Sequence, residues 1–464
     1  MFMKLVSQGC ILLILVCHIS GIKAEVRYVS TTEGDDSNYG NNPTYPLKSI
    51  EHALWQADTI LLKSGDVFYE QVVLHDKYVT KYGSGQNPVI CGFKTPLSSG
   101  CWQRVEKNIW MIDLGGDSFT GFNTNGESYL NNIGCIYDKD NDLVHGNKVQ
   151  YYRELTTNWD IWQTERFDRE TPADAFSLLY MYLDTDPNSL NLSFSVGGIG
   201  ISLYNSTLSH VNVVGFGFGI SAGANVEISN CHVDIIGGMT QLGKEWFVNY
   251  GNGIEFYVSY DISNSRVHDC YVSRTYDSGI TIQAGTENHI PRNIKVYHNL
   301  IENCGQAWED FLMTPNESVV FDQCEFCENF VINSGTSGFN YPKGRTQNCH
   351  IIGMNNKGNK GMIVRDNTFA GGNYYHSTSF GGYYKSNVWK NNTCYISPGN
   401  YLLYDHEGAI IIQLSVNDRQ ANNDSLAYYR LLTGDDTQFH IYKEKRVAII
   451  SKRIKKRYLK NHSY

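Results

Sequence analysis

The sequence predicts an all-β fold, a parallel β-helix solenoid, and two recurring phrases with their spacing carry that prediction. The first phrase combines apolar or β-branched residues with one Asn or Cys, found at Asn212, Cys231, Cys270, Asn299, Asn329, Asn367 and Asn392. These positions lie 19 to 39 residues apart, which is typical of solenoid repeats. The second phrase, glycine followed by Ile or Phe, recurs on the following strand at Gly219, Gly253, Gly279 and Gly338. A β-sandwich with frequent turns is the alternative, but two phrases recurring in the same order favour the solenoid.

Each repeat is expected to form one coil. Alternating residues such as Val267, Asp269 and Tyr271 point to opposite faces of a strand, so one set stacks inside the coil. Asn and Cys at equivalent places would stack at a bend, where Asn side chains can hydrogen-bond along the solenoid axis. The glycine of the second phrase is expected to supply the positive φ of another bend.

Composition agrees with a folded, turn-rich β protein. The 464 residues include 43 Gly and 32 Tyr against 10 Pro, with 18% charged and 41% hydrophobic residues. This balance excludes a disordered chain. A solenoid can run to this length as one body.

The N-terminus, residues 1–24, is predicted to be an export signal. Lys4 supplies the positive start, residues 10–17 form the apolar stretch, and Ala24 ends an acceptable cleavage site. The apolar run is too short to span a bilayer, and no other segment is a candidate span. We therefore expect a mature protein that begins near Glu25 and is secreted, periplasmic or attached to the cell surface.

Cysteine usage leaves alternatives open. Ten cysteines remain after the export signal, a number compatible with disulfides in an oxidising compartment. Cys324 and Cys327 have the spacing of a zinc half-site or a redox pair, but no second half-site follows. Since Cys231, Cys270 and Cys394 fall on the repeat, stacked buried thiols are the preferred interpretation.

The charge distribution is asymmetric. Residues 443–464 hold nine Lys or Arg and one Glu, which leaves 29 basic and 46 acidic side chains in the rest of the chain. Such an acidic body disfavours nucleic-acid binding. The basic tail could dock on a membrane surface or an acidic partner, and the preferred interpretation is a solvated, mobile end.

Residues 25–95 are predicted to form an N-terminal cap and the first coil. A strand at 26–30 precedes a segment at 47–57 with helical spacing, which would cover the open end of the solenoid core. The stretch Tyr28–Glu70 resembles the cap of right-handed parallel β-helix proteins of the pectate-lyase-like superfamily. The resemblance implies a right-handed solenoid and a secreted carbohydrate-active protein, and it carries no catalytic residue.

The remaining chain divides into three predicted parts. Residues 96–195 read as an inserted small β-subdomain, 196–400 as the main solenoid, and 401–464 as a C-terminal segment with the basic tail. This layout is similar to that of secreted bacterial β-helix glycosidases, including a fucosidase/xylanase-type family with such an insertion. The similarity is one of layout and involves no diagnostic motif.

The repeat also predicts how far apart carboxylate side chains on neighbouring coils lie. Stacked strands lie about 4.8 Å apart. Glycoside hydrolysis needs two carboxyl groups about 5–5.5 Å apart for retention or about 6.5–9.5 Å apart for inversion. Alignment of the first phrase places three residues in one column, namely Asp234, Ser273 and Glu302. Asp234 and Glu302 would then lie on either side of the middle coil, near the inverting separation.

The predicted catalytic carboxylates are Asp234, Glu255, Asp277 and Glu302. The predicted substrate-binding residues are Arg274, His232, Tyr276, Trp308 and Asp310. Arginine suits a sugar hydroxyl or carboxylate, and aromatic faces suit sugar rings. Each carboxylate taken singly is equally well explained as a solvated surface group or a turn residue. Their gathering on consecutive coils favours a site.

Three classes of function follow. The preferred one is a glycoside hydrolase that acts on a complex polysaccharide, as a monomer without metal or cofactor. A polysaccharide lyase is the runner-up; it would need an Arg or Lys base and often calcium, and its candidate bases are Arg274, Arg292, Lys295, Lys343 and Arg345. The acidic body favours the hydrolase. A non-catalytic glycan-binding surface protein on the same fold is the third class.

Overall fold

The computed structural model describes residues 25–464 except 98–99, 117–118, 125–126, 167–169, 245–247, 258–261, 285–289, 313–319, 340–347, 355–360, 380–386, 407–409 and 463. The predicted export signal at 1–24 lies outside the described residues. Among the described helices, none is long and apolar enough to cross a membrane.

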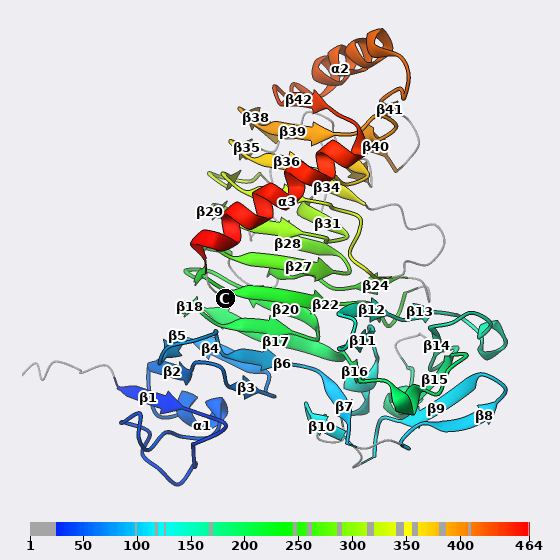
Figure 1. Ribbon diagram of the computed structural model, residues 1–464. Helices are drawn as coiled ribbons and strands as arrows, with labels where there is room; N and C mark the ends of the chain where they lie inside the picture. The colour runs from blue at the N-terminus through cyan, green and yellow to red at the C-terminus, as the bar shows by residue number, and fades with distance from the viewer. Residues whose placement is uncertain are drawn as a thin grey trace, which may run out of the picture.

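Three ten-stranded sheets, which we name A, B and C, form the body of the molecule (Figure 1). Sheet A contains β1 (Val26–Val29), β2 (Thr59–Lys63), β5 (Tyr78–Tyr82), β18 (Thr207–Ser209), β21 (Glu227–Ser229), β26 (Ser263–His268), β29 (Arg292–Tyr297), β32 (Glu325–Cys327), β35 (Met362–Arg365) and β38 (Asn387–Lys390). Sheet B contains β3 (Val67–Phe68), β6 (Val89–Cys91), β19 (Asn212–Val214), β22 (His232–Ile236), β27 (Tyr271–Thr275), β30 (Leu300–Glu302), β33 (Phe330–Ile332), β36 (Thr368–Ala370), β39 (Thr393–Ile396) and β42 (Gln438–Ile441). Sheet C contains β4 (Val72–His75), β17 (Val196–Tyr204), β20 (Phe216–Ala222), β25 (Ile254–Tyr257), β28 (Ser278–Ala284), β31 (Gln306–Leu312), β34 (Cys349–Met354), β37 (Tyr374–Ser379), β40 (Tyr401–Asp405) and β41 (Ile411–Gln413).

One coil visits sheets A, B and C in turn. Strands β26, β27 and β28 make one coil, and β29, β30 and β31 make the next, which pairs with it in parallel register on all three sheets. Within the described part of the three sheets, the only antiparallel pair is β40 with β41. The predicted parallel β-helix is confirmed.

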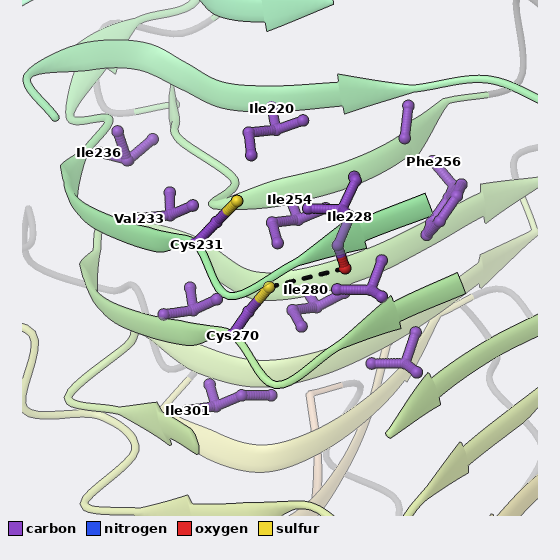
Figure 2. Packing of buried hydrophobic residues seen from close by; sticks show 14 of the residues in the cluster. Ile220, Ile228, Cys231, Val233, Ile236, Ile254, Phe256, Cys270, Ile280 and Ile301 are labelled. Atoms are coloured by element: carbon purple, nitrogen blue, oxygen red, sulfur yellow. Dashed lines mark hydrogen bonds between the residues drawn. The ribbon is translucent and has the colours of Figure 1, made fainter. Parts of the chain in front are cut away.

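The interior of the coils is apolar and contains thiols as well as aliphatic side chains. Figure 2 shows Cys231 and Cys270 pointing inward among isoleucines such as Ile254 and Ile280. The Cys270 thiol donates to the carbonyl of Ile228 at 3.7 Å. All ten described cysteines are free, and no described group of His, Cys, Asp or Glu has the arrangement of a metal site. Stacked buried thiols, the preferred interpretation of the cysteine repeat, are confirmed.

An asparagine ladder holds the bend between sheets A and B. Each Asn amide donates through Nδ2 to Oδ1 of the next, at 3.0 Å from Asn299 to Asn329, 3.1 Å from Asn329 to Asn367 and 3.0 Å from Asn367 to Asn392. The residue before each rung adopts a left-handed φ between 55° and 58°, at His298, Glu328, Asp366 and Asn391. The ladder predicted from the repeat is therefore present, over four consecutive coils.

The glycines of the second phrase have a different role from the expected one. Gly219, Gly253 and Gly279 do not adopt positive φ, whereas Gly338 does at 82°. A Cβ at Gly219 would lie 2.3 Å from the carbonyl oxygen of Gly253, and one at Gly253 would lie 2.5 Å from that of Gly279. These three positions need glycine because adjacent coils approach too closely for a side chain.

The N-terminal end of the solenoid is covered as predicted. Helix α1 (Ile50–Leu54) begins after Ser49, whose side chain accepts from the His52 amide. Ile50 and Ala53 are buried in the solenoid core. The helix begins later than the expected segment 47–57 because Leu47 pairs with Val29 as a β-bridge, and it ends at Leu54.

A small β-subdomain is inserted between β6 of sheet B and β17 of sheet C. One of its sheets contains β7 (Lys94–Pro96), β10 (Phe119–Gly121), β11 (Ile136–Asp138), β12 (Leu143–His145) and β16 (Leu192–Phe194). The other contains β8 (Gln103–Glu106), β9 (Ile109–Asp113), β13 (Asn147–Lys148), β14 (Asp160–Trp162) and β15 (Leu178–Tyr182). The short 3-10 helices are Ser128–Asn131, Tyr152–Glu154, Ala173–Phe176 and Pro187–Ser189. The subdomain has its own apolar core around Trp102, Leu179 and Phe194. A two-stranded hairpin, β23 (Met239–Thr240) and β24 (Asn249–Tyr250), projects from the neighbouring coil.

The C-terminal segment forms two helices rather than a mobile end. Helix α2 (Arg419–Thr433) lies at the end of the solenoid opposite α1, and helix α3 (Glu444–Asn461) crosses the outer face of sheet B (Figure 1). Ile450, Ile454 and Tyr458 pack on apolar side chains of that sheet. The Tyr458 hydroxyl also donates to the carbonyls of Cys270 and His298, at 2.9 and 3.0 Å. The expectation of a solvated tail was wrong because the apolar residues between its charges follow helical spacing and sheet B offers them a matching face.

Candidate active site

The column predicted from the repeat exists on sheet B. Asp234 pairs in register with Ser273, and Ser273 with Glu302, on β22, β27 and β30. The two carboxylates therefore lie two strands apart, as predicted. Both are almost fully buried.

Cations neutralise both carboxylates of this column. Asp234 accepts from Arg274 Nε at 2.9 Å and from Arg274 Nη2, and it also accepts from Ser273 Oγ at 2.8 Å. Burial would raise the pKa of Asp234, but hydrogen bonds and charge from Arg274 outweigh it and hold that pKa below its usual value. Glu302 accepts from the Tyr271 hydroxyl at 2.5 Å and pairs with Lys455 Nζ of α3 at 2.5 Å. A carboxylate with a lowered pKa, such as Asp234, is poorly suited to proton transfer, and the side chain of Glu302 is engaged by Tyr271 and Lys455.

The other residues predicted near this column share its structural role. Arg274 also pairs with Asp142 of the inserted subdomain, at 2.6 Å, so it ties that subdomain to the coils. The His232 ring stacks on Tyr271 with centroids 4.3 Å apart, and its Nε2 lies 3.0 Å from Ser273 Oγ. The cluster thus connects the coils of sheet B with the inserted subdomain through Asp142 and with helix α3 through Lys455.

A second group of carboxylates lies on sheet C. Glu255, Thr281 and Glu309 pair in register on β25, β28 and β31. They point outward, because Ile254, Ile280 and Trp308 precede them and fill the core. At about 4.8 Å per strand, the backbones of Glu255 and Glu309 are about 10 Å apart.

Hydrogen bonds draw the Glu309 carboxylate back toward the middle strand. Its Oε2 accepts from Thr281 Oγ1 at 2.8 Å, from Ser278 Oγ at 3.0 Å and from Gln283 Nε2 at 3.2 Å. All three donors belong to β28. The carboxyl group of Glu309 is therefore nearer to Glu255 than the two strands are.

The side-chain amides of Asn252 and Gln306 hold Glu255 and Asp277 in place. Asn252 Nδ2 donates to Glu255 Oε2 at 2.5 Å, while Asn252 Oδ1 accepts from the Ser278 amide at 3.1 Å. Gln306 Nε2 lies 3.0 Å from Asp277 Oδ1 and 2.7 Å from Ser278 Oγ. Asp277 therefore sits at the start of the middle strand, between the coils of Glu255 and Glu309.

Both glutamates have raised pKa values. Burial, assisted by the negative charge of Asp277, raises the pKa of Glu255 to about 7 and that of Glu309 to about 8. No Lys or Arg of the described residues forms an ion pair with either glutamate. Carboxyl groups that hold a proton near neutral pH beside another carboxylate are suited to general acid and base chemistry.

Three predicted binding residues point away from this surface. Trp308 and Asp310 are fully buried on the inner face of β31, where Trp308 stacks on Phe326 with centroids 4.6 Å apart. Asp310 accepts from Asn387 Nδ2 at 3.4 Å. Tyr276 is 1% exposed and packs edge-on against Phe339. None of these three side chains is placed to stack on or bind a glycan at the outer face.

Glu309 is the residue of this site that the sequence interpretation missed. The second phrase reads Gly253-Ile254-Glu255 and Gly279-Ile280-Thr281, and the next coil reads Ala307-Trp308-Glu309. Because Ala307 stands where the other copies have glycine, this copy of the second phrase was not recognised. Accepting Ala307 as a variant would have aligned Glu309 with Glu255.

The candidate lyase bases do not gather at this surface in the described part of the chain. Arg292 and Lys295 lie on sheet A, where Arg292 pairs with Asp322 at 2.7 Å and Lys295 lies over the Tyr297 ring. Lys343 and Arg345 lie outside the described residues. The six strands of sheet C from β25 to β40 contain no Lys or Arg.

Aromatic side chains continue the outer face of sheet C beyond Glu309. The column runs in register from Glu309 through Ile352 and Ser377 to Tyr404. The rings of Tyr374 and Tyr404 stack with centroids 5.0 Å apart, and Tyr401 meets Tyr374 edge-on at 4.8 Å. All three rings are half-buried.

The chain is a parallel β-helix protein with a cluster of carboxyl side chains, Glu255, Asp277 and Glu309, on sheet C. No protein-family model matches it, and no curated protein sequence matches it. Similar solved structures include the complex of XylC with xylose, at 15% identity and a TM-score of 0.44, which covers 82% of this chain and 64% of that one. This chain thus spans less than two thirds of the XylC chain. A protein described as a glycoside hydrolase has 10% identity and a TM-score of 0.44, covering 88% of this chain and all of that one. A GH136 lacto-N-biosidase from Eubacterium ramulus has 13% identity and a TM-score of 0.36, covering 90% of this chain and 67% of that one.

Proposed function

We propose that this protein is a glycoside hydrolase whose active site is the outer face of sheet C around Glu255, Asp277 and Glu309. The observation that carries the proposal is the in-register pair of glutamates with raised pKa values on either side of one strand. Inverting hydrolysis requires two carboxyl groups about 6.5–9.5 Å apart. Two strand spacings of about 4.8 Å, shortened by the lean of Glu309, fall in that range.

The roles follow from the pKa values. Glu309, whose pKa is about 8, is protonated at neutral pH and would donate its proton to the leaving oxygen. Glu255, whose pKa is about 7, loses its proton first and would activate a water molecule on the opposite side of the sugar. Burial and, to a smaller extent, the charge of Asp277 keep both pKa values high, and that charge would stabilise positive charge on the sugar ring in the transition state.

An uncharged glycan is the substrate class that this surface favours. A uronate needs a cation to balance its carboxylate, and strands β25 to β40 of sheet C contain none. The rings of Tyr374 and Tyr404 offer stacking surface for sugar rings further along the same sheet. A polysaccharide lyase is the second candidate, with Lys343 and Arg345, outside the described residues, as its bases.

The test is a digest of uncharged and uronate glycans with the purified protein and four variants. Glu255→Gln and Glu309→Gln should each lower kcat/KM on the cleaved glycan by on the order of 10²-fold or more. Asp234→Asn and Glu302→Gln, the matched pair on sheet B, should change it only a few-fold while folded, as checked by circular dichroism. Activity of the parent should be highest between about pH 7 and 8. Full activity of both sheet C variants would refute the site, and an unsaturated uronate product would identify a lyase.

A further inference from the structure

The side of helix α3 that faces away from the coils is a continuous basic surface. Figure 1 shows α3 lying across the strands of sheet B, and the side toward the sheet is apolar, with Ile450, Ile454 and Tyr458 in contact. At 3.6 residues per turn, an arc of about 140° on the opposite side contains Ile449 and otherwise only Lys and Arg. These exposed cations, which we name the α3 basic face, are Lys445, Arg446, Lys452, Arg453, Lys456, Arg457 and Lys460.

The α3 basic face has no counter-charge among the described residues. The ion pair that α3 forms with a described carboxylate is that of Lys455 with Glu302, and Lys455 lies at the flank of the helix, outside the arc. Glu444, the acidic residue of the helix, also lies outside the arc. Arg446 lies over the Tyr442 ring at 3.8 Å, a contact that does not neutralise its charge. Like charges held on one helix face repel each other, so a bound anion would stabilise this surface.

The shape of the α3 basic face favours a polymer over a small anion. The stretch from Lys445 to Lys460 is about 22 Å long at 1.5 Å per residue. A helix surface is convex and its side chains diverge, so it does not enclose a small anion. An extended polyanion can instead contact the cations one after another along the helix.

The charge of the rest of the molecule favours a thin and flexible polyanion. Outside residues 443–464 the chain has 29 basic and 46 acidic side chains. A flat anionic membrane or a rigid duplex would bring this acidic body close to negative charge, whereas a flexible chain can contact α3 alone. Ile449 is the only apolar residue of the arc, at 42% exposed, so the face lacks the apolar surface that membrane insertion requires. The same lack disfavours an acidic protein segment, which would need apolar anchors.

We propose that the α3 basic face binds a linear acidic polysaccharide, a polar and flexible chain whose carboxylates recur along its length. Lys and Arg would pair with successive carboxylates, and each Arg can bind one through two N–H groups. Sheets B and C face different sides of the solenoid, so this polymer leaves the surface around Glu255 and Glu309 free. Helix α3 thereby holds the protein on an acidic matrix. Binding at α3 does not depend on whether sheet C cleaves a glycan.

Carboxymethylcellulose is the probe, and hydroxyethylcellulose is the uncharged polymer with the same backbone. Biolayer interferometry on the immobilised polymers measures the dissociation constant of the full protein. The parent should bind the charged polymer and not the uncharged one. Raising the salt concentration from about 50 to about 200 mM should weaken this binding about tenfold or more, because screening and counterion release govern contacts between exposed charges.

A triple variant tests the residues. Lys452→Gln, Arg453→Gln and Lys456→Gln together remove three charges from the middle of the α3 basic face and keep good helix formers. This variant should bind carboxymethylcellulose on the order of tenfold more weakly or worse. Circular dichroism checks that it remains folded.

The matched control removes the same number of charges at exposed positions outside α3. It combines Lys107→Gln, Lys244→Gln and Arg419→Gln, and it should bind as the parent does. Glu309→Gln should also bind as the parent does, because its change lies on sheet C.

Four outcomes would overturn the proposal. They are equal binding of the two polymers by the parent, no binding of carboxymethylcellulose at low salt, equal losses in the two triple variants, and loss of binding in Glu309→Gln. Tighter binding of duplex DNA, or of vesicles with equal parts phosphatidylserine and phosphatidylcholine, than of carboxymethylcellulose would overturn the choice of a polysaccharide.

Discussion

At the scale of single residues, the surroundings of each carboxyl group decide its chemistry. Asp234 and Glu255 are both almost fully buried on outward faces of the solenoid. Arg274 pairs with Asp234 and keeps its pKa low, whereas burial and the repulsion of Asp277 raise the pKa of Glu255 despite the hydrogen bond from the Asn252 amide. The same side-chain chemistry thus gives an ion-pair anchor on sheet B and a proton-holding group on sheet C.

The raised pKa of Glu255 predicts how stability depends on pH. Its folded pKa of about 7 lies above its ordinary value of 4.5. Its contribution to the free energy of unfolding is therefore complete below pH 4.5 and is lost as pH rises through 7. Glu255→Gln should therefore become more stable than the parent above pH 7, by up to roughly 3 kcal/mol at 1.36 kcal/mol per pKa unit. Urea unfolding at pH 4.5, 6 and 9 measures the difference.

The sheet B carboxylate supplies a control of opposite sign. The pKa of Asp234 is lowered, so its contribution is present above its ordinary pKa and is lost as pH falls. Asp234→Asn should be less stable than the parent at pH 6 and 9. A Glu255→Gln curve that runs parallel to that of the parent would contradict the assignment of a raised pKa.

At the scale of elements, helix α3 determines which carboxylates are paired with a cation from the C-terminal segment and which are not. Its apolar side covers Leu300, Ile332 and Ala370 of sheet B, and Lys455 extends from it to Glu302. On sheet C, helix α2 contacts β40 and β41, whereas the glutamates lie on β25 and β31 and are partnered by neutral groups. The basic C-terminal helix therefore covers the outer face of sheet B, whereas the proposed active site lies on sheet C.

The pair of Lys455 and Glu302 predicts a coupling between α3 and the coils. Lys455→Met leaves the buried Glu302 carboxylate with only the Tyr271 hydroxyl and should cost on the order of 2–3 kcal/mol. This value lies below that of a fully buried pair because Lys455 is 37% exposed. The double variant with Glu302→Gln should recover most of the loss. Additive losses in urea unfolding would show that the pair contributes little.

At the scale of the whole molecule, stability depends on repeated contacts between neighbouring coils. The asparagine ladder, the close approach at Gly219 and Gly253, and the inward isoleucines recur from coil to coil. Each coil contacts mainly the coils before and after it, so damage to one coil is felt first by its neighbours.

The ladder gives a prediction at this scale. Asn329→Ala removes the acceptor of Asn299 Nδ2 and the donors to Asn367 Oδ1 and the Val296 carbonyl, all of them buried. Each unsatisfied group costs about 1–3 kcal/mol, so a loss of about 3 kcal/mol or more is expected. Hydrogen exchange should accelerate first in the coils of β29 to β36. Asn417→Ala, at an exposed position with an ordinary φ, should change stability by less than about 0.5 kcal/mol, and equal effects of the two variants would refute the role of the ladder.

The sequence by itself determined the solenoid, the register of its coils and the covered N-terminal end. These features follow from local periodicity: the positions of Asn299 and Asn329 align coils, and the column of Asp234 and Glu302 follows from that alignment. Only the tertiary structure decided which column is paired with cations. The cations at Asp234 and Glu302 come from Arg274, held by the inserted subdomain, and from Lys455 on a helix far along the chain. Because no local pattern records such long-range pairing, the sequence identified Glu255 and Asp277 without ranking them above Asp234 and Glu302, and it left Glu309 unrecognised beside the buried Trp308.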